Sequence, residues 1–199
     1  MDERVVQAMA RWPNVPACTG WLALDRRGRW RMRDEAAQAA GALGETIDHT
    51  LLNEFIGRNY QSDAAGRWFF QNGPQRVYVD LAYTPWVLRA QYDASHERIV
   101  LRDHVGGSFA AIAVWLSDDG NVLFEAQDGP GQTRRIALLH DHDLDLCADR
   151  LVMRDGAGAP EAFQLTPERS LPVHQIRTVD LPSRFGFEPR PRLDANARP

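Results

Sequence analysis

The sequence predicts an α+β protein dominated by β-strands, in which an N-terminal hairpin and helix pack on a duplicated antiparallel β-unit. Three observations indicate this class. Short apolar runs alternate with turn residues through most of the chain, residues 48–60 have the spacing of an amphipathic helix, and residues 66–107 resemble residues 120–158. A length of 199 residues is sufficient for one compact domain or for two small lobes that share a core.

Residues 1–60 are predicted to form a region of helix, hairpin and helix. Asp2 can cap a first short helix, because apolar residues recur after it at helical spacing. The turn Asp25-Arg26-Arg27-Gly28 lies between apolar segments at 20–24 and 29–33, a pattern typical of a β-hairpin.

The next segment, 34–45, is rich in Ala and Gly and indicates a surface connection or a weak helix. A longer helix follows over 48–60, where one apolar stripe recurs at helical spacing. The residues of this stripe are Leu51, Leu52, Phe55, Ile56 and Tyr60.

From residue 61 to residue 185 the chain is predicted to consist of short strands separated by Gly, Asp, Asn and Pro turns, which is typical of an antiparallel sheet, sandwich or barrel. The predicted strands are 68–71, 76–81, 86–92, 98–102, 109–116, 122–126, 134–139, 144–147, 151–154 and 162–165. Residues 186–199 are rich in Pro and Arg and are predicted to be a disordered tail.

Two stretches of this β-region resemble each other in the same order. Gln71-Asn72-Gly73-Pro74 returns as Gln127-Asp128-Gly129-Pro130, and the Arg98–Asp103 strand returns as Arg150–Asp155. Chance similarity between short strands with Gly turns is the alternative, but the preserved order favours a duplication. We therefore expect two tandem repeats, 66–107 and 120–158, that share one core.

Composition excludes several classes of protein. A net charge of −4 lacks the basic surplus of a nucleic-acid-binding protein, and the longest apolar run is far shorter than the ~20 residues of a membrane span. The charged start and the two cysteines predict a cytoplasmic protein without a signal peptide or a disulfide framework. All 23 basic residues are Arg, a bias typical of a GC-rich bacterial genome.

A strip of polar side chains on the 76–81 strand is the best candidate for a ligand-binding site. Alternation places Arg76, Tyr78 and Asp80 on one face of this strand. That face offers charge, hydrogen bonds and a stacking surface to a ligand. The alternative is a cross-strand ion pair on a solvated sheet face.

A second candidate site is the cluster His140-Asp141-His142-Asp143. Two imidazoles on one strand face, completed by a carboxylate, can bind Zn or Mn, so His140, His142 and Asp143 are the candidate ligands. The cluster also coincides with an expected connection between strands, where solvated His and Asp are common. We therefore predict no cofactor and keep this metal site as the alternative.

The segments Arg11–Pro16, Gly20–Leu22, Gly28–Arg31 and Gly66–Val79 resemble an uncharacterised family of short proteobacterial proteins. The plan of hairpin, helix, second hairpin and repeated β-units is also similar to a second β-rich family of unknown function, for which a signalling role has been suggested. Neither resemblance implies a catalytic residue.

These observations support three hypotheses of function. The first is a non-catalytic module that binds a small ligand or a protein, in signalling or regulation, and it is favoured because no nucleophile–base set is evident. The second is a metal-dependent enzyme that uses His140, His142 and Asp143. The third is a structural protein that forms a homodimer through strand edges.

Overall fold

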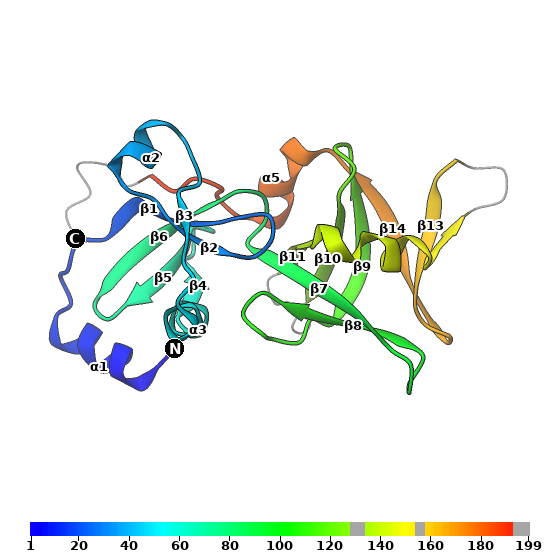
Figure 1. Ribbon diagram of the computed structural model, residues 1–199, viewed down its shortest axis with the longest axis horizontal. Coiled ribbons are helices and arrows are strands. Elements are labelled where there is room, and N and C mark those ends of the chain that lie inside the picture. The colour runs from blue at the N-terminus through cyan, green and yellow to red at the C-terminus, as the bar shows by residue number, and fades with distance from the viewer. Residues whose placement is uncertain (128–133, 154–157, 193–199) are drawn as a thin grey trace. The chain divides into compact units, whose positions relative to one another are not determined.

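The computed structural model describes residues 1–127, 134–153 and 158–192, which divide into two compact units (Figure 1). Unit 1 consists of residues 1–85 together with the C-terminal segment that begins at Gly186, and unit 2 consists of residues 86–185. The β-dominated α+β class is confirmed. The division falls after Pro85, whereas the sequence predicted a boundary near residue 60.

Unit 1 contains one six-stranded sheet, in the order β3-β2-β1-β6-β5-β4. All its strand pairs are antiparallel except β1 and β6, which are parallel. The strands are β1 (Cys18–Leu24), β2 (Trp30–Met32), β3 (Glu45–Thr46), β4 (Tyr60–Ser62), β5 (Trp68–Asn72) and β6 (Gln75–Leu81). The helices are α1 (Glu3–Arg11), α2 (Glu35–Ala39) and α3 (Thr50–Arg58).

Three aromatic rings pack together in unit 1, and two of them, Trp30 and Tyr60, are buried in its core. Tyr60 contacts Trp30 edge to face at 5.0 Å between ring centroids and Trp68 at 4.7 Å. Its buried hydroxyl donates to the Pro85 carbonyl oxygen at 3.0 Å. The core is completed by strand residues that face inward, such as Leu24 and Val79. Aromatic pairs of this kind add stabilisation beyond the area that they bury.

Unit 2 contains one eight-stranded sheet, in the order β12-β13-β14-β9-β10-β11-β7-β8. The pairs β11–β7 and β14–β9 are parallel and the others are antiparallel. The strands are β7 (Trp86–Asp93), β8 (Arg98–Asp103), β9 (Ala111–Ser117), β10 (Val122–Gln127), β11 (Arg134–Leu139), β12 (Leu151–Met153), β13 (Pro160–Thr166) and β14 (Arg169–Ile176). The helices are η1 (Asp141–Asp143), α4 (Leu144–Ala148), η2 (Thr178–Asp180) and α5 (Leu181–Phe185).

The same strand pairing occurs in both units. In unit 1 the order β2-β1-β6-β5-β4 matches the order β8-β7-β11-β10-β9 of unit 2, with a parallel pair at the same place. This pairing makes β10–β11 equivalent to β5–β6, as the similar Gln-containing turns suggest, but it makes β8 equivalent to β2 and not to β12. The predicted repeat 66–107 therefore contains strands of both units, because recurring Gly turns and Arg-rich strands do not define which strands pair.

Some predicted elements are wrong. Residues 144–147, predicted as a strand, lie in α4, where Leu144 and Cys147 are three residues apart and Cys147 is buried. The predicted helix over 48–60 is confirmed as α3. Leu51, which belongs to the predicted apolar stripe, is however 70% exposed. Among the described residues, no helix is long and apolar enough to cross a membrane.

The prediction of a disordered tail from residue 186 is wrong for residues 186–192, and residues 193–199 lie outside the described residues. The Glu188 amide donates to the Gly66 carbonyl at 3.0 Å, and the Leu81 amide donates to the Pro189 carbonyl at 2.7 Å. Phe187 is buried. The Pro and Arg content that suggested disorder thus belongs to a segment that completes unit 1.

Candidate functional site

The strip predicted on β6 is not an exposed surface. Arg76 is exposed, with its guanidinium 4.7 Å from the centroid of the Phe69 ring. Tyr78 is buried and donates a hydrogen bond of 3.1 Å to Oδ2 of Asp63. Asp80 is also buried and forms an ion pair with Arg33. The three side chains therefore have separate partners and do not form one site.

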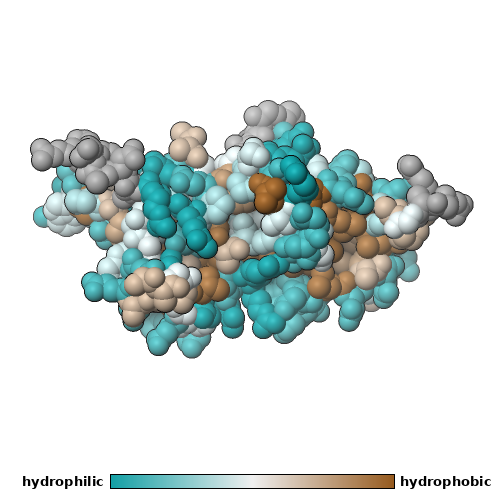
Figure 2. Space-filling model, turned by 90° about the horizontal axis from the view of Figure 1, so that it is seen from above, coloured by the Kyte–Doolittle hydropathy of each residue, from teal (hydrophilic) through white to brown (hydrophobic). Residues whose placement is uncertain are grey.

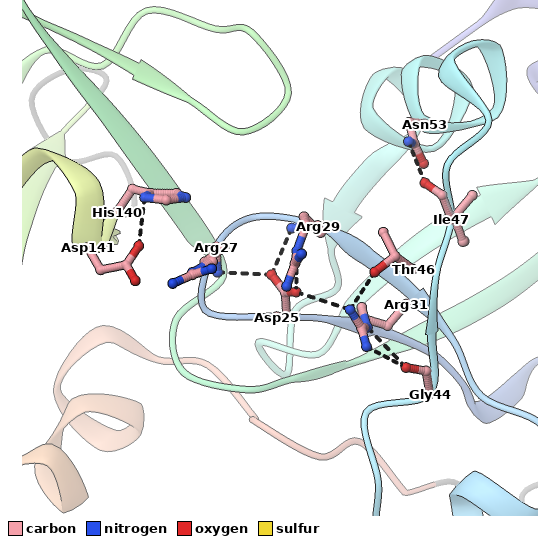
Figure 3. Close-up of polar contacts among 10 residues, drawn as sticks. All are labelled: Asp25, Arg27, Arg29, Arg31, Gly44, Thr46, Ile47, Asn53, His140 and Asp141. Carbon is pink, nitrogen blue, oxygen red and sulfur yellow. Dashed lines mark hydrogen bonds and ion pairs between the residues drawn. The ribbon is translucent and has the colours of Figure 1, made fainter.

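Two turns with the sequence Asp-x-x-Gly-Arg-Trp hold their carboxylates in the same way. Oδ1 of Asp25 accepts from the Arg27 and Arg29 amides, each at 2.9 Å, and Oδ2 accepts from Nε of Arg29 at 2.8 Å (Figure 3). Asp63 accepts the equivalent three hydrogen bonds, and the Gly at the fourth position has a φ of 76° in both turns. These carboxylates are therefore structural groups that close hairpins.

The Asp63 turn predicts a dependence of stability on pH. Burial opposes ionisation of Asp63, but hydrogen bonds from Arg67 and Tyr78 outweigh it and lower its pKa below 3.8. A group whose pKa is lower in the folded state stabilises the fold above its unfolded pKa, and this contribution is lost as pH falls through the folded pKa. We expect Asp63→Asn to destabilise unit 1 at neutral pH and to cost progressively less below about pH 4.

Denaturation of both proteins over a pH series measures this difference in the free energy of unfolding. Asp48→Asn is the matched control, because Asp48 is an exposed carboxylate of the same unit. A difference between wild type and Asp63→Asn that stays constant down to pH 2 would contradict the assignment.

The His140, His142 and Asp143 side chains do not converge on a metal site. Both carboxylate oxygens of Asp143 accept from Arg89, at 2.7 and 3.0 Å, and one also accepts from the Ala90 amide. Nδ1 of His140 lies 2.9 Å from the Asp141 carboxylate (Figure 3) and 3.1 Å from the His142 amide nitrogen. Within residues 1–127, 134–153 and 158–192, no group of three or more His, Cys, Asp or Glu residues is placed to bind a metal ion.

The local electrostatics of this cluster fit a structural role. Burial lowers the pKa of His140, against the opposing charge of Asp141. Burial raises the pKa of Asp143, but the hydrogen bonds from Arg89 and Ala90 outweigh it and lower the pKa overall. An ionised Asp143 bound by a guanidinium fastens the start of α4 to β7, where Arg89 and Ala90 lie.

Unit 2 contains an open groove of about 640 Å³ between β9, β14, η2 and α5. The floor is formed in part by Trp115, and the rim carries the charged side chains of Asp118, Arg177, Asp180 and Arg184. A volume of this size lies within the range of small-molecule sites. Hydrophilic residues also cover most of the coloured surface in Figure 2, with hydrophobic residues interspersed among them.

Trp115 is held in place from several sides. Its indole Nε1 donates to Oε2 of the buried Glu125 at 2.8 Å, and the other oxygen of Glu125 lies 3.1 Å from Nη1 of Arg134. Its ring contacts His174, the neighbouring residue on β14, at 4.7 Å between centroids. The Arg184 guanidinium lies over the same indole at 4.3 Å from the ring centroid. The floor of the groove is therefore a fixed aromatic surface with one cation stacked on it.

The other rim charges have partners within the groove. Arg177 forms a two-pronged ion pair with Asp180, at 2.8 and 3.0 Å. Oδ1 of Asp118 accepts from the Thr178 amide and hydroxyl, and these hydrogen bonds lower the pKa of Asp118. Arg184, by contrast, has no carboxylate partner among the residues that the structure describes.

The sequence did not indicate the groove. Its walls come from β9 and β14, which pair in parallel although they are about sixty residues apart, as shown by the register of Val114 with Val173. Pro172 lies inside β14 and weakens the strand pattern there, since Pro is rare inside sheets. The spacing of Leu171 and Val173, both facing inward more than their neighbours, is the signal that could have identified this strand.

Comparisons with known proteins give a family but no activity. A family model described as DUF2944, "Protein of unknown function (DUF2946)", matches residues 1–192. No curated protein matches the chain. Two crystal structures are similar to it. A DUF1285 family protein from Silicibacter pomeroyi DSS-3 has a TM-score of 0.45 and 16% identity, over 86% of this chain and 94% of that one. A DUF1285 family protein from Shewanella baltica OS155 has a TM-score of 0.42 and 12% identity, over 64% of this chain and 89% of that one.

Proposed function

We propose that unit 2 is a non-catalytic module that binds a small organic carboxylate in its groove. The chain belongs to the DUF2944 family of proteins of unknown function. The proposal rests on the surroundings of the Arg184 guanidinium. Its planar face is covered by Trp115, while its exposed N–H edge faces no carboxylate among the described residues. A carboxylate matches the fork of donors along such an edge.

The remaining groups of the groove support the same ligand class. Arg177 and Asp180 neutralise each other, so the pair offers little net charge to a ligand. The Trp115 indole is 6% exposed and lies under the Arg184 guanidinium, so it holds this cation in place for the acid group of a ligand.

The hydrogen bonds of the hydroxyl and imidazole groups favour binding over catalysis. Ser117 Oγ donates to the Asp119 carboxylate and Ser183 Oγ donates to the Asp180 carbonyl, so neither of these hydrogen bonds involves an imidazole. In the exposed turn after β7, Nδ1 of His96 contacts both Ser95 and Asp93, whereas a relay would require the two ring nitrogens. A module that binds a ligand without transforming it is consistent with a role in signalling, and the free thiols of both cysteines are consistent with the cytoplasm.

Binding of benzoate tests this proposal. We expect benzoate to shift the NMR signal of the Trp115 indole N–H, which is distinctive because it donates to Glu125. Arg184→Ala should raise the dissociation constant of benzoate roughly tenfold or more, since a hydrogen bond to a charged group contributes about 1.5–3 kcal/mol.

Arg98→Ala is the matched control, because Arg98 is an exposed cation of the same unit on β8, away from the groove. Its affinity for benzoate should equal that of the wild type. Equal affinity of Arg184→Ala and wild type, or no benzoate binding at all, would refute the proposal.

A further inference from the structure

The charged side chains of the unit 2 groove do not all act on a ligand. Those that line it belong to Asp118, Arg177, Asp180 and Arg184. Arg177 and Asp180 neutralise each other through two hydrogen bonds, at 2.8 and 3.0 Å. One cation, Arg184, and one anion, Asp118, are therefore left to attract the charged groups of a ligand.

The Asp118 carboxylate is held at the end of the groove where β9 and β14 end. The Asp118 amide donates to the Ile176 carbonyl at 3.2 Å, and Oδ1 of Asp118 accepts from the Thr178 amide at 2.8 Å and from the Thr178 hydroxyl at 2.7 Å. These hydrogen bonds from Thr178 lower the pKa of Asp118, so the carboxylate is ionised at neutral pH. Asp118 forms no ion pair with any residue that the structure describes.

The Arg184 guanidinium lies at a different place along the same groove. It stacks on Trp115, at 4.3 Å from the ring centroid, and Trp115 comes three residues before Asp118 in the chain. Because a strand rises about 3.3 Å per residue, Trp115 and Asp118 are separated by roughly 10 Å along β9. The groove therefore has a positive end and a negative end.

These two ends act differently on a ligand with one charge and on a ligand with two. A carboxylate alone is attracted by Arg184 and repelled by Asp118, whereas an ammonium group at the far end of the same molecule is attracted by Asp118. The two ligand charges must be several bonds apart to reach both ends, and an α-amino acid has only one carbon between them. Asp118 is exposed, so the ammonium group stays partly hydrated and the gain in affinity is modest.

We infer that the groove binds an ω-amino acid, a zwitterion whose carboxylate binds Arg184 and whose ammonium group, at the other end of a short chain or ring, binds Asp118. This inference rests on the proposed function, because it requires Arg184 to bind the acid group, and it adds the second charge of the ligand. Asp118 is then the residue that distinguishes an ω-amino acid from a simple carboxylate.

NMR titration of the full chain with two ligands of similar size tests this inference. At neutral pH, 4-(aminomethyl)benzoate has both charges and 4-methylbenzoate has only the carboxylate. At an ionic strength of about 20 mM we expect 4-(aminomethyl)benzoate to bind about two- to fivefold more tightly, which is the gain typical of an exposed ion pair. At about 0.5 M salt this preference should be lost, because salt screens exposed charges.

The variant Asp118→Asn assigns the preference to one side chain. Its amide oxygen can still accept from Thr178 although the charge is gone, so the protein should keep its fold and lose the preference. Glu168→Gln is the matched control, because Glu168 is an exposed carboxylate of the same unit that lies just before β14, at the opposite end of this strand from the groove. It should keep the preference of the wild type.

The outcomes separate this inference from the proposed function. Equal binding of the two ligands by the wild type at low salt, or an undiminished preference in Asp118→Asn, would overturn the inference and leave the proposed function standing. Failure of 4-methylbenzoate to bind, or equal affinity of wild type and Arg184→Ala for this ligand, would refute the proposed function and the inference together.

Discussion

Arg33→Ala is expected to lower the free energy of unfolding of unit 1 by about 3–5 kcal/mol, because it leaves Asp80 as a buried charge without its cation. The variant also removes the hydrogen bond from Nε to the Ala42 carbonyl, which holds the segment after α2. Urea denaturation followed by the fluorescence of Trp30 and Trp68, both in unit 1, measures the loss.

Two comparisons isolate the buried charge as the cause. The double variant Arg33→Leu with Asp80→Leu should recover most of the lost stability, since replacing both ions by apolar groups is often neutral. Arg58→Ala removes a cation of the same unit that is 53% exposed and whose partners Asp2 and Glu54 are also exposed to solvent, and it should cost less than about 1 kcal/mol. Similar losses for Arg33→Ala and Arg58→Ala would show that Asp80 is solvated.

Gly66→Ala is expected to release the C-terminal segment from unit 1. A Cβ at this position would lie 2.1 Å from the Gly186 carbonyl oxygen and 2.9 Å from its carbon, so one backbone must move. The movement breaks the hydrogen bond from the Glu188 amide to the Gly66 carbonyl. The loss should exceed the ~1–2 kcal/mol that a left-handed conformation costs any residue with a Cβ.

Gly120→Ala separates the two effects of that substitution. Gly120 has a φ of +81°, close to the +76° of Gly66, but a Cβ there would meet no atom within 4 Å. Gly120→Ala should therefore lose only the free energy of unfolding that a left-handed conformation costs a residue with a Cβ. Hydrogen exchange should show faster exchange of the Glu188 and Leu81 amides in Gly66→Ala only. Equal losses of stability in the two variants would contradict the close approach of Gly66 to Gly186.

Local chemistry made much of the fold predictable. The Asp25 turn and the β1–β2 hairpin follow from an Asp-x-x-Gly pattern in which the carboxylate accepts backbone amides and the Gly adopts a positive φ. Most strands of unit 2 up to β11 were likewise predicted, because their apolar runs are separated by turn residues. In these segments the local preference and the final structure agree.

Long-range pairing and context explain what could not be predicted. The prediction of a strand over 144–147 was wrong because Leu-Asp-Leu-Cys satisfies both the alternation of a strand and the i, i+3 spacing of a helix. The prediction of disorder over 186–192 was wrong because the hydrogen-bond partners of this segment, the Gly66 carbonyl and the Leu81 amide, lie more than a hundred residues away. Composition describes a segment alone and contains no information about such partners.

The candidate sites show the same limit of local reasoning. Asp80 was predicted to lie on an exposed polar strip, but it is buried in an ion pair with Arg33, which is 47 residues away and gave no signal. The Arg184–Trp115 contact joins β9 to α5 across a parallel strand pair. The metal cluster drew attention because its residues are adjacent in sequence, whereas Asp143 is bound to Arg89 of β7.

The return of the chain to unit 1 after unit 2 affects the order in which the protein is completed during translation. The ribosome releases residues 1–85 first, yet Pro189, which accepts from the Leu81 amide, emerges only after all of unit 2. Unit 1 therefore remains unfinished while unit 2 folds. Until residues 186–192 emerge, the hydrogen bonds of the Gly66 carbonyl and the Leu81 amide to this segment cannot form. A nonsense mutation before residue 186 would consequently impair the earliest-synthesised half of the protein.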